Sequence, residues 1–374
     1  MLAREGERVR SSVAKEGKRT VRRSGQAATA RDVALRAGVS PMTVSRVVGG
    51  ENNVRASTRE IVLAAVRELN YAPNLAAKNL ASAAQARVGL LFANPSAAYL
   101  TEFLVGILDD MSRRGAQLII ERCEAGDDLS ERTAVRHLIA GQVAGILLPP
   151  PLSESAIIRQ EAAKAGVVAI AVSTGRFTGD ISCIRIDDRK AAYDMTRRII
   201  ELGHRHIGFI KGHPNQTAST ERFAGFEAAI RDLAPRAKKV SAQGYFSYQS
   251  GLLAAERLLA GKDRPTAIFA ANDDMAAAVV SVAHRKGLDV PRDISVVGFD
   301  DTAIATTLWP ELTTVRQPIG EMAIAAVELL FKEMRDRKDS SSSKPIDLVM
   351  HHTLIERQST AATREPAASQ KTEG

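Results

Sequence analysis

The chain has 374 residues, 45% apolar and 25% charged, with a formal net charge of +8. This length suggests two or three domains rather than one, and the apolar fraction is ample for sizeable cores. No apolar run approaches the roughly 18 residues of a membrane span, and the polar N-terminus lacks the apolar segment of a secretory signal. Cys123 and Cys183 show no CxxC spacing. We therefore expect a cytoplasmic protein with two buried thiols and no membrane partner.

The excess positive charge lies at the N-terminal end. Residues 1–86 contain 15 Lys or Arg and 7 Asp or Glu, and the remaining residues contain 36 of each. A basic segment attached to a neutral body is typical of nucleic-acid binding. Residues 1–28 contain few large apolar side chains, so we expect a disordered basic leader. This leader either adds non-specific attraction to phosphates or is dispensable.

The stretch ARDVALRAGVSPMTVSRVV, residues 30–48, has the pattern of two short helices joined by a tight turn. Apolar residues recur at helical spacing in both halves. Gly38 suits the turn, and Ser40 is a natural N-cap with Pro41 at the first helical position. A third amphipathic helix follows in RASTREIVLAAVRELNY. The pattern is typical of a helix-turn-helix, whose second helix lies in a DNA major groove. The alternative is a helical hairpin without that role.

From residue 87 onward, short apolar strands alternate with amphipathic helices. The first run of strands is VGLLFAN, GAQLIIERC, VAGILLPP and VVAIAVS, and after CIRIDD the alternation resumes with HIGFIKG, AIFAAND and ISVVGFDD. Such alternation indicates parallel sheets covered by helices on both faces. We therefore expect two α/β lobes with a ligand cleft at the carboxyl ends of their strands. ELTTVRQPIGEMAIAAVELLFKEM should cross between the lobes and form a long helix, before a last strand in HHTLIERQS.

These patterns predict five parts of the chain. They are a leader at 1–28, a helix-turn-helix domain at 29–72, a hinge helix or linker at 73–86, a two-lobed domain at 87–357 and a disordered tail at 358–374. Within the two-lobed domain we expect lobe 1 at about 87–183 and 319–345, and lobe 2 at about 184–318 and 346–357. The tail has no leucine heptads, which argues against a coiled-coil tetramer.

Three segments of the chain resemble the lactose-repressor (LacI/GalR) family of bacterial transcription regulators. They are DVALRAGVSPMTVSRVVGG, TREIVLAAVRELNYAPNLAAKNL and VGLLF, and the resemblance runs from about residue 30 to residue 357. It implies an N-terminal all-α helix-turn-helix domain and a two-lobed, periplasmic-binding-protein-like α/β domain with doubly wound parallel sheets. It also implies a homodimer that binds a pseudo-palindromic operator, with a sugar effector between the lobes that controls operator affinity.

Base reading in the major groove requires side chains that project from the second helix. Arg46 can donate two hydrogen bonds to a guanine, and it matches a family position that reads bases. Pro41 and Met42 match positions that set operator preference in the family, where they offer apolar contact, for instance with a thymine methyl. Ser40 suits contacts to phosphates. Thr43 and Ser45 also carry hydroxyl groups that suit contacts to phosphates. The alternative is that both simply form solvated helix surface.

The segment NLAAKNLASAA follows Pro73 and is short, so we expect it to fold as a helix when two copies meet on DNA. In the matching family segment, Leu80 inserts into the minor groove at the operator centre and kinks the DNA. An apolar wedge of this kind unstacks a base step. The alternative is that this leucine packs into a core. The resemblance also places Asn74 and Ala77 among the DNA-binding residues.

Polar side chains follow several of the predicted strands at the junction of the two lobes. They are Arg222, Asn272, Asp274 and Asp300, with Asp187, Asp188, Asp273 and Asp301 beside them. Carboxylates, an amide and a guanidinium that converge on one cleft suit a polyhydroxylated ligand, because each can make paired hydrogen bonds to vicinal hydroxyls. Flat apolar faces for a sugar ring are expected from three aromatic residues: Tyr99, Phe246 and Trp309.

Effector-binding positions of the family fall on four residues of this chain: Arg222, Phe246, Asn272 and Asp300. Tyr99 follows the first-strand loop that lines the pocket in the family. The chain departs from some members after the fourth strand, where Ala171 stands in place of a strand-end aspartate. Four of these residues have a plainer interpretation. Asp188 and Asp301 could be helix caps or surface residues. Asp273 could support its loop, and Trp309 could be a packed loop residue.

An enzyme would need a catalytic or cofactor-binding set, which the sequence lacks. It contains no GxxxxGK[ST], no GxGxxG after a strand and no GxSxG. The histidines of LGHRHIGFI and HHTLIERQS have no acidic or cysteine partner at metal spacing. We therefore predict no enzyme, no metal and no cofactor, and expect a repressor of carbohydrate-utilisation genes whose effector is an inducer or a corepressor. The alternatives are a stand-alone carbohydrate-binding protein of the same fold and a cleft enzyme with a regulatory DNA arm.

Overall fold

The computed structural model describes residues 28–48, 54–69, 71, 86–338 and 344–363. The chain divides into two compact units, residues 1–84 and residues 85–374. Within the described residues, no helix is both long and apolar enough to cross a membrane. The predictions for the leader and for the hinge residues Asn74, Ala77 and Leu80 lie outside the described residues.

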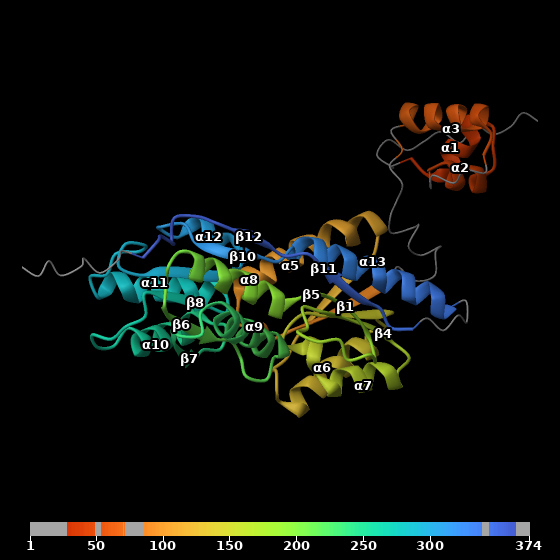
Figure 1. Cartoon of the computed structure of the whole chain (residues 1–374). Coiled ribbons are helices and arrows are strands. Elements are labelled where there is room, and N and C mark those ends of the chain that lie inside the picture. Colours follow the sequence, from red (N-terminus) through yellow and green to blue (C-terminus); the bar gives the residue numbers. More distant parts are fainter. Residues whose placement is uncertain (1–27, 49–53, 70, 72–85, 339–343, 364–374) are drawn as a thin grey trace, which may run out of the picture. The chain divides into compact units, whose positions relative to one another are not determined.

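The N-terminal unit has the three predicted helices, which pack on one another (Figure 1). They are α1 (Ala30–Ala37), α2 (Pro41–Val48) and α3 (Ala56–Glu68). Thr29 and Asp32 form a capping box at the start of α1, and Gly38 ends that helix with a φ of 66°, which a residue without a Cβ adopts without strain. Apolar side chains from all three helices form its core: Val33, Ala34, Val44, Val47, Val62 and Ala65.

The first sheet of the C-terminal unit has six parallel strands in the order β11-β5-β4-β3-β1-β2. The strands are β1 (Arg87–Phe92), β2 (Gln117–Arg122), β3 (Gly145–Leu148), β4 (Val168–Val172), β5 (Ser182–Ile186) and β11 (Asp347–Met350). The helices of this lobe are α5 (Ala97–Arg114), α6 (Asp128–Ala140), η1 (Leu152–Glu154), α7 (Ala156–Lys164) and α13 (Ile319–Lys338). The α5–α13 pair covers one face of the sheet, and the α6–α7 pair covers the other (Figure 1). We call this part lobe 1.

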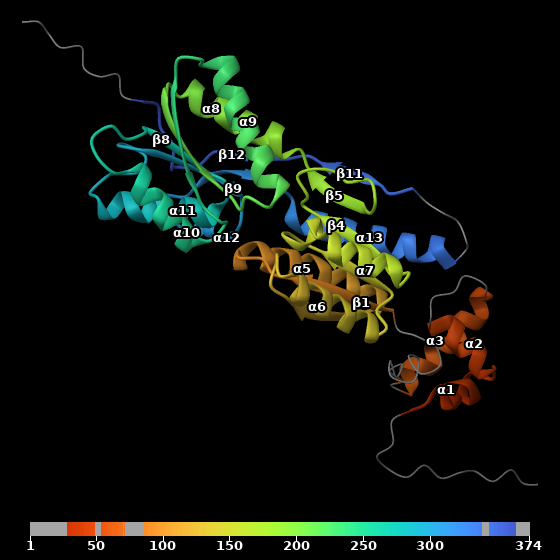
Figure 2. The ribbon, with the colours of Figure 1, turned by 90° about the horizontal axis from the view of Figure 1, so that it is seen from below.

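The second sheet also has six strands, in the order β12-β10-β9-β8-β6-β7, and makes lobe 2. Its strands are β6 (His206–Lys211), β7 (Lys238–Gln243), β8 (Ala267–Ala270), β9 (Ser295–Asp300), β10 (Thr313–Arg316) and β12 (Thr353–Ile355), the last antiparallel to β10. The helices are α8 (Asp188–Glu201), α9 (Thr217–Leu233), α10 (Tyr248–Leu258), α11 (Asp273–Arg285) and α12 (Ala303–Thr307). The α8–α9 pair and the α10–α11 pair lie on opposite faces of this sheet (Figure 2). The fold class predicted from the sequence is confirmed.

The strands are short and apolar because helices cover both faces of each sheet. Every residue of β4 and of β9 is buried. Two glycines let helices approach closely: a Cβ at Gly106 of α5 would lie 2.7 Å from a backbone oxygen of α13, and one at Gly225 of α9 would lie 2.1 Å from a backbone oxygen of α8. Cys123 and Cys183 are both buried.

The predicted lobe boundary is wrong at two points. β5 pairs with β4 and β11 in lobe 1, so lobe 1 continues past residue 183. β11 lies in lobe 1 although residues 346–357 were assigned to lobe 2, and only β12 joins the second sheet. Both strands are apolar enough for either sheet, so their partners depend on long-range pairing. The chain crosses between the lobes after β5, after β10 and after β11.

Two further elements differ from the expectation. β7 was not predicted, because this edge strand reads KKVSAQ and keeps most of its side chains at least partly exposed. The first residues of the expected tail, 358–363, pack on lobe 2. Ser359 is fully buried and its carbonyl accepts from Val296 N at 2.9 Å, while Thr363 N donates to Leu202 O at 2.9 Å. Backbone hydrogen bonds order this polar segment, and these leave no apolar signature in its sequence.

Candidate effector pocket and DNA-reading face

The outer face of α2 carries the side chains predicted to meet DNA. Val44 and Val47 point into the core, while Ser45 and Arg46 are exposed and Met42 is 65% exposed. Pro41 is also exposed. An α-helix whose opposite face is held by a small core can present such a surface to a major groove.

Ser40 and Thr43 are already bonded to each other. The Ser40 Oγ accepts from Thr43 N at 3.2 Å, and the two hydroxyl oxygens lie 2.9 Å apart. Ser40 therefore caps α2 as expected. Its predicted contact to a phosphate would be made by a hydroxyl that also holds the start of the helix in place.

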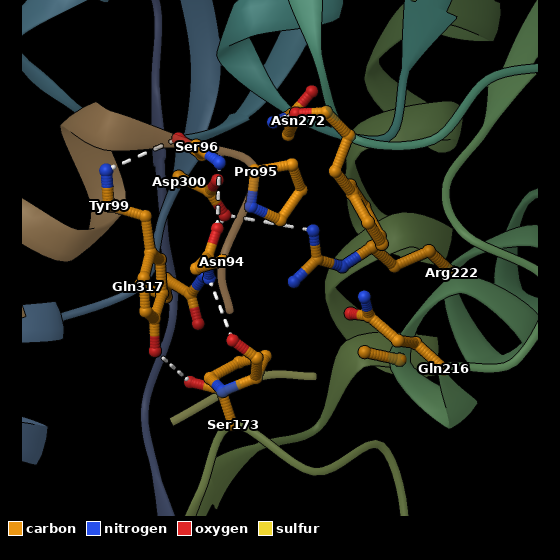
Figure 3. Close-up of a pocket in the computed structure, with 13 residues that line it drawn as sticks. Asn94, Pro95, Ser96, Tyr99, Ser173, Gln216, Arg222, Asn272, Asp300 and Gln317 are labelled. Atoms are coloured by element: carbon orange, nitrogen blue, oxygen red, sulfur yellow. Dashed lines mark hydrogen bonds and ion pairs between the residues drawn. The ribbon is translucent and has the colours of Figure 1, made fainter. Parts of the chain in front are cut away.

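Between the two lobes lies a pocket with about 400 Å³ of space, part of it open to solvent, which we call the effector pocket. Its walls come from the loops that follow strands of both sheets, as expected for ligands of open α/β sheets. Its lining residues are Asn94, Pro95, Ser96, Tyr99, Pro150, Ser173, Gln216, Ala218, Arg222, Phe246, Asn272, Asp300 and Gln317. Figure 3 shows these side chains converging from lobe 1 and lobe 2.

Arg222 of α9 is the one arginine or lysine of this lining and is only 4% exposed. Its Nε donates to Asp188 at 2.7 Å, and its Nη1 donates to the Ala271 carbonyl at 2.6 Å. The guanidinium carbon also lies 3.6 Å from the centre of the Phe299 ring. These contacts fix the guanidinium in one plane, and within the described residues no hydrogen bond uses its Nη2.

Asp300 ends β9 beside this arginine. One carboxylate oxygen lies 3.6 Å from the Arg222 Nη1 and accepts from the Gln317 Nε2 at 2.6 Å (Figure 3). Burial raises the pKa of Asp300 to about 7, although Arg222 and Gln317 act in the opposite direction. The backbone φ of Asp300 is 114°, a strained value that places its side chain in the pocket.

Lobe 1 supplies hydroxyl groups from α5 and from the loop after β4. Tyr99 OH lies 2.7 Å from Ser173 Oγ, and burial raises the pKa of Tyr99 (Figure 3). Ser96 caps α5 and donates to the carboxylate of Asp274 in lobe 2 at 2.6 Å. The pocket therefore contains a direct hydrogen bond between the two lobes.

Asn272 and Phe246 support each other in lobe 2. The Asn272 Nδ2 donates to the Phe246 carbonyl at 2.9 Å, and its Oδ1 caps α11 by accepting from Met275 N at 3.1 Å. Phe246 has a φ of 60°, and its ring lies so close to Gly212 that a Cβ there would be 2.0 Å from the ring. Most of the hydrogen-bonding capacity of Asn272 is thus used to shape the wall.

Further contacts join the lobes beside the pocket. Glu154 of lobe 1 accepts from Thr217 N at 2.9 Å and from Thr217 Oγ1 at 2.6 Å, at the start of α9. Arg176 of lobe 1 pairs with Glu221 of lobe 2 at 2.5 Å. Gly175 packs against the backbone of the first turn of α9. The structure therefore describes lobes in direct contact, with the cleft closed at this side.

The structure brings five of the seven predicted effector residues into the lining: Tyr99, Arg222, Phe246, Asn272 and Asp300. Asp274 lies behind them, bonded to Ser96. Trp309 is 78% exposed and lies outside the lining, so it is neither a wall of this pocket nor a packed loop residue. It stands in the loop after α12, where the following Pro310 rather than the tryptophan is buried.

The aspartates with plainer interpretations fall into two groups. The side chain of Asp273 accepts hydrogen bonds from Thr302 N at 2.8 Å and from Thr314 Oγ1 at 2.6 Å. It therefore supports the loop, in agreement with its plainer interpretation. Asp188 is neither a cap nor surface: it is buried against Arg222, and Asp187 caps α8 instead. The same interpretation is wrong for Asp301, whose buried carboxylate pairs with Arg316 at 2.6 Å and with Arg357 at 2.7 Å. Burial raises the pKa values of both Asp188 and Asp273.

Sequence reasoning missed several polar lining residues, above all Ser173, Gln216 and Gln317. Each follows a strand by one to five residues, at the carboxyl edge of its sheet. That position was the available signal, but serine and glutamine are common in solvated loops. Within the described residues, no group of three His, Cys, Asp or Glu side chains could hold a metal ion.

Comparison with known proteins covers both units. The model of the family described as bacterial regulatory proteins, lacI family, matches residues 29–74, and that of a periplasmic binding protein-like domain matches residues 196–360. Catabolite control protein A of Priestia megaterium is 33% identical over 332 residues, which cover 88% of this chain and 98% of that protein.

Two solved structures extend the likeness. A lac repressor dimer bound to operator and the anti-inducer ONPF has a TM-score of 0.70 at 29% identity, over 90% of this chain and 100% of that one. A complex of the transcriptional regulator CelR with cellobiose has a TM-score of 0.66 at 29% identity, over 89% of this chain and 99% of that one. The chain belongs to the lacI family of bacterial regulatory proteins.

Proposed function

We propose that this chain is a homodimeric transcriptional repressor whose affinity for a pseudo-palindromic operator is controlled by a sugar in the effector pocket. One observation carries the proposal: a single chain joins a helix-turn-helix unit to a two-lobed unit whose buried polar pocket takes side chains from both lobes. The similar lac repressor, solved as a dimer on its operator, supports the same arrangement.

On the DNA side, α2 reads the operator in the major groove. Arg46 donates to a guanine, and Pro41 and Met42 offer apolar contact to neighbouring bases. The hydroxyls at the start and on the outer face of the helix contact phosphates. The hinge residues Asn74, Ala77 and Leu80 contact the minor groove, with Leu80 as the apolar wedge.

On the ligand side, the unused polar atoms of the pocket favour a neutral polyhydroxylated molecule. Within the described residues, no hydrogen bond uses Nη2 of Arg222 or Oδ2 of Asp300, and Oε1 of Gln317 is buried without a partner. One donor and two acceptors side by side match the hydroxyls of a sugar, which both donate and accept. The CelR–cellobiose complex supports this ligand class.

A sugar in the pocket contacts Ser173 and Tyr99 of lobe 1 together with Arg222 and Asp300 of lobe 2. It therefore stabilises the lobe arrangement in which all four groups reach it, and that differential affinity shifts the equilibrium between lobe angles. Exposed apolar side chains one turn apart on α5, Val105 and Leu108, support a partner surface on lobe 1. Across such a surface, a change in lobe angle alters the spacing of the two helix-turn-helix units.

The test is operator selection from random duplex DNA with the full chain, followed by a screen of sugars against the bound complex at one stated salt concentration. We expect one enriched palindrome of two half-sites. Release by a sugar makes that sugar an inducer, and tightening makes it a corepressor. Binding that stays independent of sequence and collapses with added salt would overturn the proposal, because only the electrostatics of the basic segment would remain.

A further inference from the structure

A second pocket adjoins the effector pocket and shares Pro95 and Gln216 with it, and we call it the outer pocket. It contains about 1100 Å³ of space, including space open to solvent. Its lining residues are Ala93, Pro95, Ala125, Gly126, Glu131, Pro151, Glu154, Ser155, His213, Asn215, Gln216, Tyr245 and Ser247. Figure 3 shows Pro95 and Gln216 from the side of the effector pocket.

The position of the outer pocket follows from the strand order. Its walls come from the segments after β1, β2 and β3 in lobe 1 and after β6 and β7 in lobe 2. β2 and β7 are edge strands, at the opposite end of each sheet from β11 and β12, where the chain crosses between the lobes. The outer pocket is therefore the open mouth of the cleft, and a ligand too long for the effector pocket extends into it.

An aromatic side chain, Tyr245, lines this mouth and is about half exposed. Tyr245 is 48% exposed, and its ring contacts His213 edge-to-face with 5.6 Å between ring centres. A tyrosine ring offers a large apolar face together with a polar hydroxyl group, and both can contact a bound ring. Within the described residues, no hydrogen bond uses the Tyr245 hydroxyl or the side-chain amide of Asn215, which is exposed beside it in the lining.

The remaining polar groups make the outer pocket unsuited to an anion. Its lining contains no lysine or arginine but includes two carboxylates, Glu131 and Glu154. Glu131 accepts from Gly126 N at 2.7 Å, and Glu154 accepts from Thr217 N across the cleft. The negative charge of these two carboxylates repels a phosphorylated or carboxylated ligand. The groups that remain for a ligand are the aromatic ring of Tyr245 and the amide of Asn215, which suit a neutral ring.

We propose that the outer pocket is a second sugar subsite, so that the effector is a disaccharide or longer glycoside rather than a monosaccharide. The first ring occupies the effector pocket, the glycosidic bond passes between Pro95 and Gln216, and the second ring stacks on Tyr245. Asn215 supplies hydrogen bonds to the hydroxyls of that ring. This assignment rests on the proposed function of the inner pocket as a sugar site.

The experiment is isothermal titration of the full chain with matched pairs of neutral sugars: glucose with cellobiose and with maltose, galactose with lactose, and xylose with xylobiose. We expect one disaccharide to bind at least about tenfold more tightly than its monosaccharide. Tyr245→Ala should lower the affinity for that disaccharide about tenfold and leave that for the monosaccharide within about twofold. Asn215→Ala should lower the affinity for the disaccharide by a smaller factor and leave that for the monosaccharide unchanged.

Tyr248→Ala is the matched control, because Tyr248 is a half-exposed tyrosine three residues away that lies outside the lining and bonds to Ser281 instead. It should leave both affinities unchanged. Equal binding of a monosaccharide and its disaccharide, or indifference of the disaccharide to Tyr245→Ala, overturns the second subsite and leaves the proposed function standing. Failure of every sugar to bind overturns the subsite and the sugar effector together, while operator selection still reports on the repressor.

Discussion

The substitution Gly175→Ala should oppose the closed contact between the lobes without disturbing the fold of either lobe. Gly175 lies in the loop after β4 in lobe 1, and a Cβ there would lie 2.3 Å from Ala218 N and 2.4 Å from the Thr217 carbonyl carbon of lobe 2. These are backbone atoms, so no rotamer change relieves the overlap. Because the φ of Gly175 is outside the left-handed region, alanine fits the backbone of lobe 1 itself.

The size of the effect follows from the overlap. Ordinary contact begins at 3.4 Å, so the first turn of α9 must move away by about 1.1 Å. Forcing an added methyl into a packed contact costs about 1–3 kcal/mol, which corresponds to about a 5- to 150-fold loss in the population of the closed arrangement. We expect the affinity for the sugar identified by the operator screen to fall by that factor, measured by isothermal titration.

Gly320→Ala provides the control, since a Cβ at Gly320 has no atom within 4 Å and should leave the affinity unchanged. Thermal unfolding should show both variants folded, with midpoints near that of the unmodified chain. A Gly175→Ala variant that is folded and binds the sugar with unchanged affinity would refute the inference that the effector binds lobes in this closed contact.

Three further predictions concern single side chains. Arg46→Ala should weaken operator binding by about 1–3 kcal/mol, measured at fixed salt, with little change on non-specific DNA; an equal loss on both DNAs would make Arg46 a phosphate contact. Because the pKa of Asp300 is raised to about 7 and sugar hydroxyls donate to its ionised form, effector affinity should rise from pH 6 to pH 8 and then level off. Asp300→Asn should abolish that rise, and a rise that persists in this variant would assign it to another group. Arg222→Met should leave Asp188 buried without its partner and lower the free energy of unfolding by about 3–5 kcal/mol in denaturant titrations; an unchanged value would show that Asp188 becomes protonated at little cost.

The parts of the fold that depend on local pattern were predictable. The helix-turn-helix follows from apolar spacing around Gly38 and from the cap at Ser40, and the alternation of strands and helices follows from periodicity alone. The lobe assignments of β5 and β11 were not predictable in this way. Their short sequences fit either sheet, and only the pairing of β5 with β4 and of β11 with β5 decides the sheet.

The site shows the same division. Arg222, Asn272 and Asp300 could be named because they follow strands and match family positions. Ser173 and Gln317 also follow strands directly, but serine and glutamine are so common in solvated loops that this position alone did not single them out. Trp309 was named for its chemistry, and the structure places it on the surface.

In the proposed repressor, the effector pocket and the operator-binding face are thermodynamically coupled. Isothermal titration of the effector into the free protein and into the protein saturated with operator measures this coupling directly. We expect two different affinities, and because linkage is reciprocal their ratio should equal the factor by which the effector changes operator affinity. Identical affinities with and without operator would contradict it.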